Sequence, residues 1–149
     1  MQSATAENPP RVIDQLIGRY AESHRNGTNV LIHWICVPII VWCVIAFAYA
    51  IHPWVAYAGG ALGLIYYFTL SVPIALAMAL FLALALYITP LIPHAAVVAG
   101  VLFVITWVMQ FIGHKIEGKK PSFLEDLRFL LIGPVFLLAK AFRKAGVAF

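Results

Sequence analysis

The long uncharged stretch between Arg25 and Lys115 limits the possible folds more than any other feature of this sequence. No Asp, Glu, Lys or Arg lies between these two residues, so all 10 basic and 6 acidic residues fall near the two ends of the chain. A water-soluble domain needs charged side chains over its whole surface. With 63% hydrophobic and only 11% charged residues, the chain is expected to be an integral membrane protein whose middle part faces lipid.

Four apolar segments in this stretch are each long enough to cross a bilayer as a helix. They contain roughly 17 to 22 residues, which matches the length that ~30 Å of hydrocarbon requires. Small residues such as Gly59 and Gly63 would let two helices approach closely, and Trp107 is interpreted as a packing or interfacial belt residue. The predicted fold is an all-α bundle that forms one domain over residues 1–149, with transmembrane helices at residues 30–51, 54–70, 72–88 and 95–112.

Residues 10–25 precede the first predicted span and have the pattern of a short amphipathic helix. Two prolines stand where this helix would begin, and apolar side chains then recur at helical spacing, with His24 continuing the same stripe. The Asn-Gly pair at 26–27 predicts a turn, after which Thr28 or Asn29 would cap the first transmembrane helix. No apolar signal-peptide core precedes that helix, so we expect it to be retained as an anchor.

A second flanking helix is predicted at residues 122–143, where Ser122 and Glu125 fit the N-cap and N3 positions of a capping box. Only 11 uncharged residues separate Arg128 from Lys140, and they include a glycine–proline pair. Because that length is too short for an ordinary span, the helix is expected to lie in the interface or to enter the membrane partway as a re-entrant segment. A fifth crossing is the alternative, and it would place the basic C-terminal residues on the opposite side of the membrane.

Basic residues on both sides of the apolar block predict the orientation of the chain. Cytoplasmic flanks of membrane proteins are rich in Lys and Arg, so both termini are expected in the cytoplasm, with an even number of crossings. The membrane would be the bacterial inner membrane, or the endoplasmic reticulum if the source is eukaryotic. The basic residues are few and close to the spans, which favours anionic lipid headgroups over nucleic acid as their partner.

The predicted crossings sort the 5 histidines of the sequence into two groups. His52 and His94 fall at corners on the outer side, where a single histidine is typical of an interfacial anchor. His24, His33 and His114 fall together on the cytoplasmic side. Imidazole is the commonest protein ligand for metals, and three imidazoles with a carboxylate can hold a first-row metal ion while leaving coordination positions open. The inner group is therefore a candidate metal or catalytic site.

Other polar residues lie close to this inner group. Gln110, His114 and Glu117 are spaced i, i+4 and i+7 and so would share one helix face, and Asn29 lies one turn before His33. Spacing alone leaves two other classes of protein open. One is a carrier in which two inner histidines bind haem or a metal ion, and the other is a structural membrane protein without a metal. Asn29 would be either a helix cap or a polar member of the site, and a cap is the simpler interpretation.

At these same residues the sequence resembles a known family through a pattern in two parts. The parts are Tyr20-x3-His24-x4-Asn29-x3-His33 followed by Pro38, and Gln110-x2-Gly113-His114 followed by Glu117-x3-Pro121. Over nearly its whole length the chain resembles small membrane proteins once grouped as a domain of unknown function. The fungal founder of that family is a ferrous-iron-dependent 2-hydroxy-fatty-acid dioxygenase of phytosphingosine breakdown. Neither half of the pattern is expected in a generic membrane anchor.

The resemblance implies an enzyme of fatty-acid α-oxidation, which uses O₂ to convert a 2-hydroxy fatty acid into a fatty acid one carbon shorter. It implies Fe(II) as the cofactor, with the ligands His24, His33 and His114. Glu117 would be a further ligand, a residue that orients an imidazole, or neither, and Asn29 and Gln110 would orient the ligands. The carboxylate and hydroxyl oxygens of the substrate could chelate the iron, which would leave one position for O₂.

Overall fold

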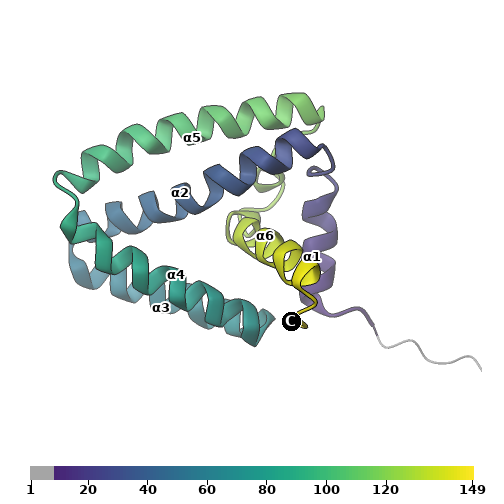
Figure 1. Cartoon of the computed structure of the whole chain (residues 1–149), viewed down its shortest axis with the longest axis horizontal. Coiled ribbons are helices and arrows are strands. Elements are labelled where there is room, and N and C mark those ends of the chain that lie inside the picture. Colours follow the sequence, from purple (N-terminus) through teal and green to yellow (C-terminus); the bar gives the residue numbers. More distant parts are fainter. Residues whose placement is uncertain (1–8) are drawn as a thin grey trace, which may run out of the picture.

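The computed structural model describes residues 9–149, and residues 1–8 of the predicted domain lie outside this range. All regular structure in the described part is helical, which confirms the predicted all-α class (Figure 1). The α-helices in chain order are α1 (Val12–Ala21), α2 (Gly27–Ile51), α3 (Pro53–Leu70), α4 (Val72–Ile88), α5 (Ala95–Glu117) and α6 (Phe129–Ala145). Two short 3-10 helices precede α5 and α6, and they are η1 (Thr89–Leu91) and η2 (Ser122–Leu124).

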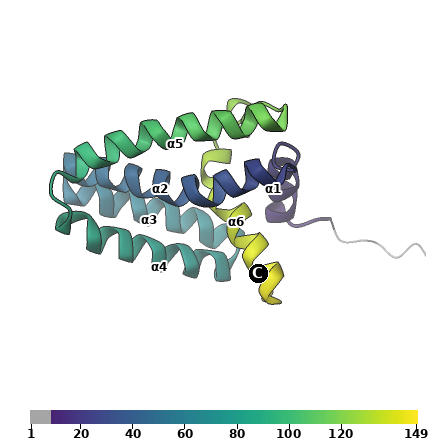
Figure 2. The same ribbon diagram turned by 45° about the horizontal axis from the view of Figure 1, so that its top comes forward.

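The helices α2 to α5 run back and forth along a common axis (Figures 1 and 2). α2 and α5 lie side by side, whereas α3 and α4 form a second pair that diverges from the first toward the end where α1 and α6 lie (Figure 1). Within residues 9–149, three stretches are long and apolar enough to cross a membrane, namely α2, α5 and the combined α4 and η1. Their length and composition are consistent with a membrane protein, as the uncharged part of the sequence predicted, but the predicted span at residues 54–70 is not among them.

Capping residues fix the corners between these helices. The ring of His52 accepts a hydrogen bond from the N–H of Trp54 at 3.2 Å and so caps the start of α3. The hydroxyl of Ser71 accepts from the N–H of Ile74 at 3.4 Å and caps α4 in the same way. His94 precedes α5 in the left-handed region, with φ at 53°. The corners at His52 and Ser71 bring α3 against α2 and α4 against α3 as antiparallel neighbours.

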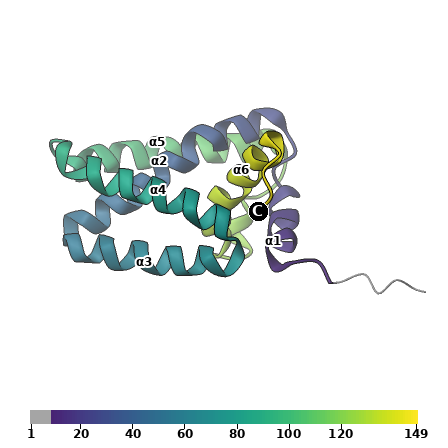
Figure 3. The ribbon, with the colours of Figure 1, turned by 60° about the horizontal axis from the view of Figure 1, so that its bottom comes forward.

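α1 and α6 close one end of the bundle and pack against each other (Figures 2 and 3). α6 also contacts α2 and α4. Apolar side chains from these helices and from α3 form the main hydrophobic core, which includes Ile13, Ile17, Val37, Tyr67, Ile74, Ile132, Val135 and Phe136. The core therefore lies at the end of the bundle that α1 and α6 close, and it anchors these two helices against α2, α3 and α4.

The turn between α1 and α2 differs from the prediction. α1 ends at Ala21 and not at residue 25, so His24 lies in the turn and not on the helix. Asn26 caps α2, because its side chain accepts hydrogen bonds from the N–H groups of Thr28 and Asn29. The predicted caps, Thr28 and Asn29, are therefore wrong, since both residues already lie inside the first turn of the helix.

The start of the last helix also differs from the prediction. α6 begins at Phe129, and Ser122 instead begins η2, so the predicted capping box is wrong. The physical reason is a tertiary contact, because the hydroxyl of Ser122 lies 2.6 Å from that of Ser23 and is used there. Just before α6, a carboxylate oxygen of Asp126 accepts from the N–H of Arg128 at 2.9 Å.

Candidate metal centre

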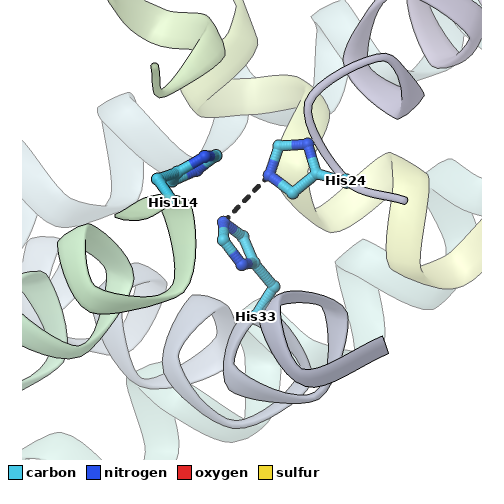
Figure 4. A group of neighbouring side chains, drawn as sticks. All are labelled: His24, His33 and His114. Atoms are coloured by element: carbon cyan, nitrogen blue, oxygen red, sulfur yellow. Dashed lines mark hydrogen bonds between the residues drawn. The ribbon is translucent and has the colours of Figure 1, made fainter. Parts of the chain in front are cut away.

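Three histidines from distant parts of the sequence meet at the end of the bundle that α1 and α6 close (Figure 4). His24 lies in the turn after α1, His33 lies near the start of α2, and His114 lies near the end of α5. One potential ligand atom from each ring lies within 4.8 Å of the others. The three residues are only 3%, 2% and 5% exposed. They are the same three that the sequence placed together on the cytoplasmic side, and as a buried group they could hold a metal ion.

Hydrogen bonds decide which nitrogen carries the hydrogen in two of these rings. Nδ1 of His24 lies 2.7 Å from the carbonyl oxygen of Tyr20, and Nδ1 of His33 lies 2.8 Å from that of Asn29. A carbonyl oxygen can only accept, so both Nδ1 atoms donate. Both Nε2 atoms then carry lone pairs in the neutral rings, yet they face each other at 3.0 Å (Figure 4). A cation beside both atoms would remove the resulting repulsion.

His114 completes the group with a buried Nδ1 that has no hydrogen-bond partner. An unpaired buried polar atom costs about 1–3 kcal/mol, and a metal ion would satisfy it. Burial, with His33 and His114 nearby, lowers the pKa of His24 to about 3, so this ring is neutral near pH 7. Neutral imidazole is the form that binds metals. The donor atoms present therefore fit a metal ion.

Residues around His24 hold its ring in one orientation. The ring of Tyr20 stacks on it, with the centroids 3.9 Å apart and the planes within 4° of parallel. The hydroxyl of Ser23 lies 3.2 Å from Nδ1 of His24 and 2.6 Å from the hydroxyl of Ser122. Sequence reasoning missed this contact between the two serines, because no periodic pattern links residues 99 positions apart.

Glu117 lies beside the turn that carries His24, and the group of candidate ligand atoms does not include it. One carboxylate oxygen accepts from the N–H of Arg25 at 3.0 Å. The other oxygen accepts from the N–H of Asn26 at 2.8 Å and from the side-chain amide of Asn29 at 3.1 Å. With three donors on one carboxylate, Glu117 links the end of α5 to the start of α2.

Asn29 is fully buried where α2 packs against α5. Its side-chain amide donates to the carbonyl of Ser23 at 3.1 Å as well as to Glu117, and its own carbonyl accepts from His33. A Cβ atom at Gly113 would clash with the side-chain oxygen of Asn29. Glycine at position 113 therefore allows the close helix contact on which this hydrogen-bond network depends.

A small cavity of about 60 Å³ lies beside the imidazoles. Gln110, one helical turn before His114, lines it, and so does Trp107, which the sequence had indicated only as a packing or belt residue. His52 and His94 lie at the corners at the opposite end of the bundle (Figure 1) and are not part of the group.

Comparison with known protein families connects this geometry to a function. The family model described as 2-hydroxy-palmitic acid dioxygenase Mpo1-like matches residues 12–145. The chain belongs to the Mpo1-like family. The matched region runs from the start of α1 to the end of α6 and so includes all three clustered histidines. The family name indicates a dioxygenase that acts on a 2-hydroxy fatty acid, and it confirms the resemblance inferred from the two-part histidine pattern. No curated protein and no solved structure matched the chain.

Proposed function

We propose that this Mpo1-like protein is an Fe(II)-dependent dioxygenase that converts a 2-hydroxy fatty acid into a fatty acid one carbon shorter. The observation that supports this most strongly is the convergence of three buried imidazoles in a chain of this family. When bound, Fe(II) would supply open coordination positions and the electrons that activate O₂. The substrates would be the 2-hydroxy acid and O₂.

His24, His33 and His114 would hold the iron. The carbonyls of Tyr20 and Asn29 accept from two of these rings, which fixes the ring orientation and directs Nε2 toward the ion. The stacked ring of Tyr20 and the neighbouring apolar residues of α6 keep bulk water away from the site. An imidazole cluster enclosed in this way remains neutral and available to the metal.

Glu117 is a positioning residue in this proposal and not a ligand. Its carboxylate accepts hydrogen bonds from N–H donors of the turn and of Asn29, so it would hold His24 in position beside the other two histidines. Gln110 would face the substrate head, because it lines the cavity beside the imidazoles.

Four crossings fit the path of the chain better than three. α2 and α4 run in the same direction, so the chain must return along the bundle between them, and α3 is the segment that does so (Figures 1 and 3). An even number of crossings places both termini on one side, and the basic flanks assign that side to the cytoplasm. α6 would then be an interfacial or re-entrant helix, and the iron would lie near the cytoplasmic leaflet of the bacterial inner membrane or the endoplasmic reticulum.

A single metal ion fits the site better than a haem does. The Nε2 atoms of His24 and His33 are 3.0 Å apart, and the adjoining cavity of about 60 Å³ is too small for a porphyrin. An absorption spectrum of the purified protein distinguishes the two, because only a haem protein shows a Soret band. A purely structural protein would retain no iron after anaerobic reconstitution.

The direct test is anaerobic reconstitution with Fe(II) and 2-hydroxypalmitic acid, followed by addition of O₂ and mass analysis of the acids. We expect the acid one carbon shorter from the wild-type protein. His33→Ala and His114→Ala should lose both iron retention and turnover, because each removes a ligand, whereas His52→Ala should retain both. Full iron content and full turnover in a purified His33→Ala variant would refute the assignment.

A further inference from the structure

A second and much larger cavity lies between the four long helices. Its volume is about 500 Å³, and its walls come from α2, α3, α4 and α5 together with residues just before and at the start of α6. The lining is almost wholly apolar, with Val44, Phe81, Leu82 and Phe103 among its residues. Ligand sites of about 300–1,000 Å³ with mostly apolar walls are typical of proteins that bind small molecules.

The large cavity adjoins the small cavity beside the histidines. Four residues line both cavities, namely Ile40, Val41, Trp107 and Leu130. The two spaces therefore share a wall, with buried imidazoles on one side and aliphatic side chains on the other. A molecule that occupies both spaces would need a small polar head beside the imidazoles and a long apolar tail in the large cavity.

Trp107 occupies this shared wall and has an unsatisfied polar atom. Its indole Nε1 is buried without a hydrogen-bond partner. An indole N–H can only donate, and buried donors of this kind usually have an acceptor. The oxygen atoms of a ligand head placed between Trp107 and the histidines would provide one.

We propose that the large cavity holds the aliphatic tail of a single-chain fatty acid whose carboxylate head lies at the histidines, with the N–H of Trp107 donating to a head oxygen. This inference rests on the proposed function and specifies how its substrate is recognised. An apolar cavity of about 150 Å³ holds benzene, which has six carbons, so about 500 Å³ has room for a tail of palmitic length. The small head cavity of about 60 Å³ excludes phospholipid headgroups and favours a free acid.

Two glycines of α3 offer a way to fill the cavity without disturbing the fold. Gly59 and Gly63 line it, and a Cβ atom at either position meets nothing within 4 Å. Removing one leucine side chain can leave a cavity of about 150 Å³, so one added leucine would fill roughly a third of the space. Gly100 on α5 is the matched control, because a Cβ there also meets nothing within 4 Å and it does not line the cavity.

The test uses metal-free protein in lipid nanodiscs and a 2-hydroxy fatty acid of palmitic length that carries a photoreactive diazirine near its methyl end. After irradiation, mass spectrometry should place the label on cavity residues such as Phe81 and Leu82, and excess 2-hydroxypalmitic acid should prevent the labelling. Label found only on lipid-facing residues outside the cavity, or label that the free acid does not displace, would overturn the proposal.

The glycine variants test whether the tail occupies this space. Overpacking a well-fitted site lowers the affinity for its ligand about tenfold or more. Gly59→Leu and Gly63→Leu should therefore reduce competed labelling by about that factor. Labelling by a probe with a tail half as long should change little, and Gly100→Leu should behave like the wild type. Unchanged labelling by the long probe in both cavity variants would overturn the assignment of the tail.

Trp107→Phe tests the head contact, with Trp54→Phe at an exposed corner as the control. Losing a hydrogen bond to a charged group costs about tenfold or more in affinity, so Trp107→Phe should need about ten times more 2-hydroxypalmitic acid for half-competition. An unchanged midpoint would refute the role of Trp107. None of these readouts needs iron or turnover. Competed labelling in a protein without dioxygenase activity would contradict the proposed function alone. Turnover without labelling of the cavity would contradict this inference alone.

Discussion

Replacing Glu117 by glutamine measures how far the metal site depends on the turn that carries His24. The wild-type carboxylate accepts from the N–H groups of Arg25 and Asn26 and from the side chain of Asn29, at 2.8 to 3.1 Å. Glutamine keeps one acceptor oxygen but places an NH₂ group against at least one of these donors. The turn would therefore lose a charge-assisted hydrogen bond and gain a donor–donor contact.

The expected size of the effect follows from these contacts. Hydrogen bonds to charged groups contribute about 1.5–3 kcal/mol, and about 1.4 kcal/mol corresponds to a tenfold change in affinity. Glu117 is only half-buried, so solvent reduces the loss toward the lower end of this range. We expect Glu117→Gln to weaken Fe(II) binding about tenfold, which agrees with the 10–100-fold loss typical of residues that orient metal ligands.

The assay is an anaerobic titration of the purified protein with Fe(II) against a competing chelator. Glu125→Gln is the control, because it removes one negative charge from an exposed residue that follows α5 and lies outside the metal site. Two results would refute the reasoning. A complete loss of iron binding, as expected for His33→Ala, would make Glu117 a ligand, and an affinity equal to that of the control would show that the turn does not depend on it.

Three further predictions follow from the structure. Gly113→Ala should lower the thermal unfolding temperature in detergent and weaken iron binding, because the added Cβ would clash with Asn29 and overpacking costs about 1–3 kcal/mol of stability. An unchanged unfolding temperature would contradict the close contact of α2 and α5. His52→Ala should destabilise the fold by about 1 kcal/mol through loss of the α3 cap, while a titration should show unchanged iron affinity. Removing the metal with a chelator should abolish turnover, with recovery on adding Fe(II). The helical circular dichroism spectrum should stay intact, since apolar side chains that do not bind the metal form the main core. Loss of the helical signal would show that the metal also holds the fold.

The helices themselves could be predicted because each depends on local sequence. An uncharged apolar run must become a helix in lipid, where its own backbone is the nearest source of hydrogen bonds. The helix-breaking corners at His52 and Ser71 then divide the run at the positions observed. Segments near the ends were predicted less well, because Ser122 forms a tertiary contact that competes with its local capping preference.

The grouping of His24, His33 and His114 needed only the number of predicted crossings, because an even number of helical passes returns α5 to the side where α2 begins. The contacts within the site needed the tertiary structure. The hydrogen bonds of Glu117 to the turn depend on how α5 meets the start of α2, which no local pattern encodes. The position of Trp107 between two cavities depends on how α3 and α4 diverge from the other pair. The sequence thus determined which residues are placed together, because helix length and polarity are local properties. Packing decided what each residue contacts, because contacts between helices depend on residues far apart in the sequence.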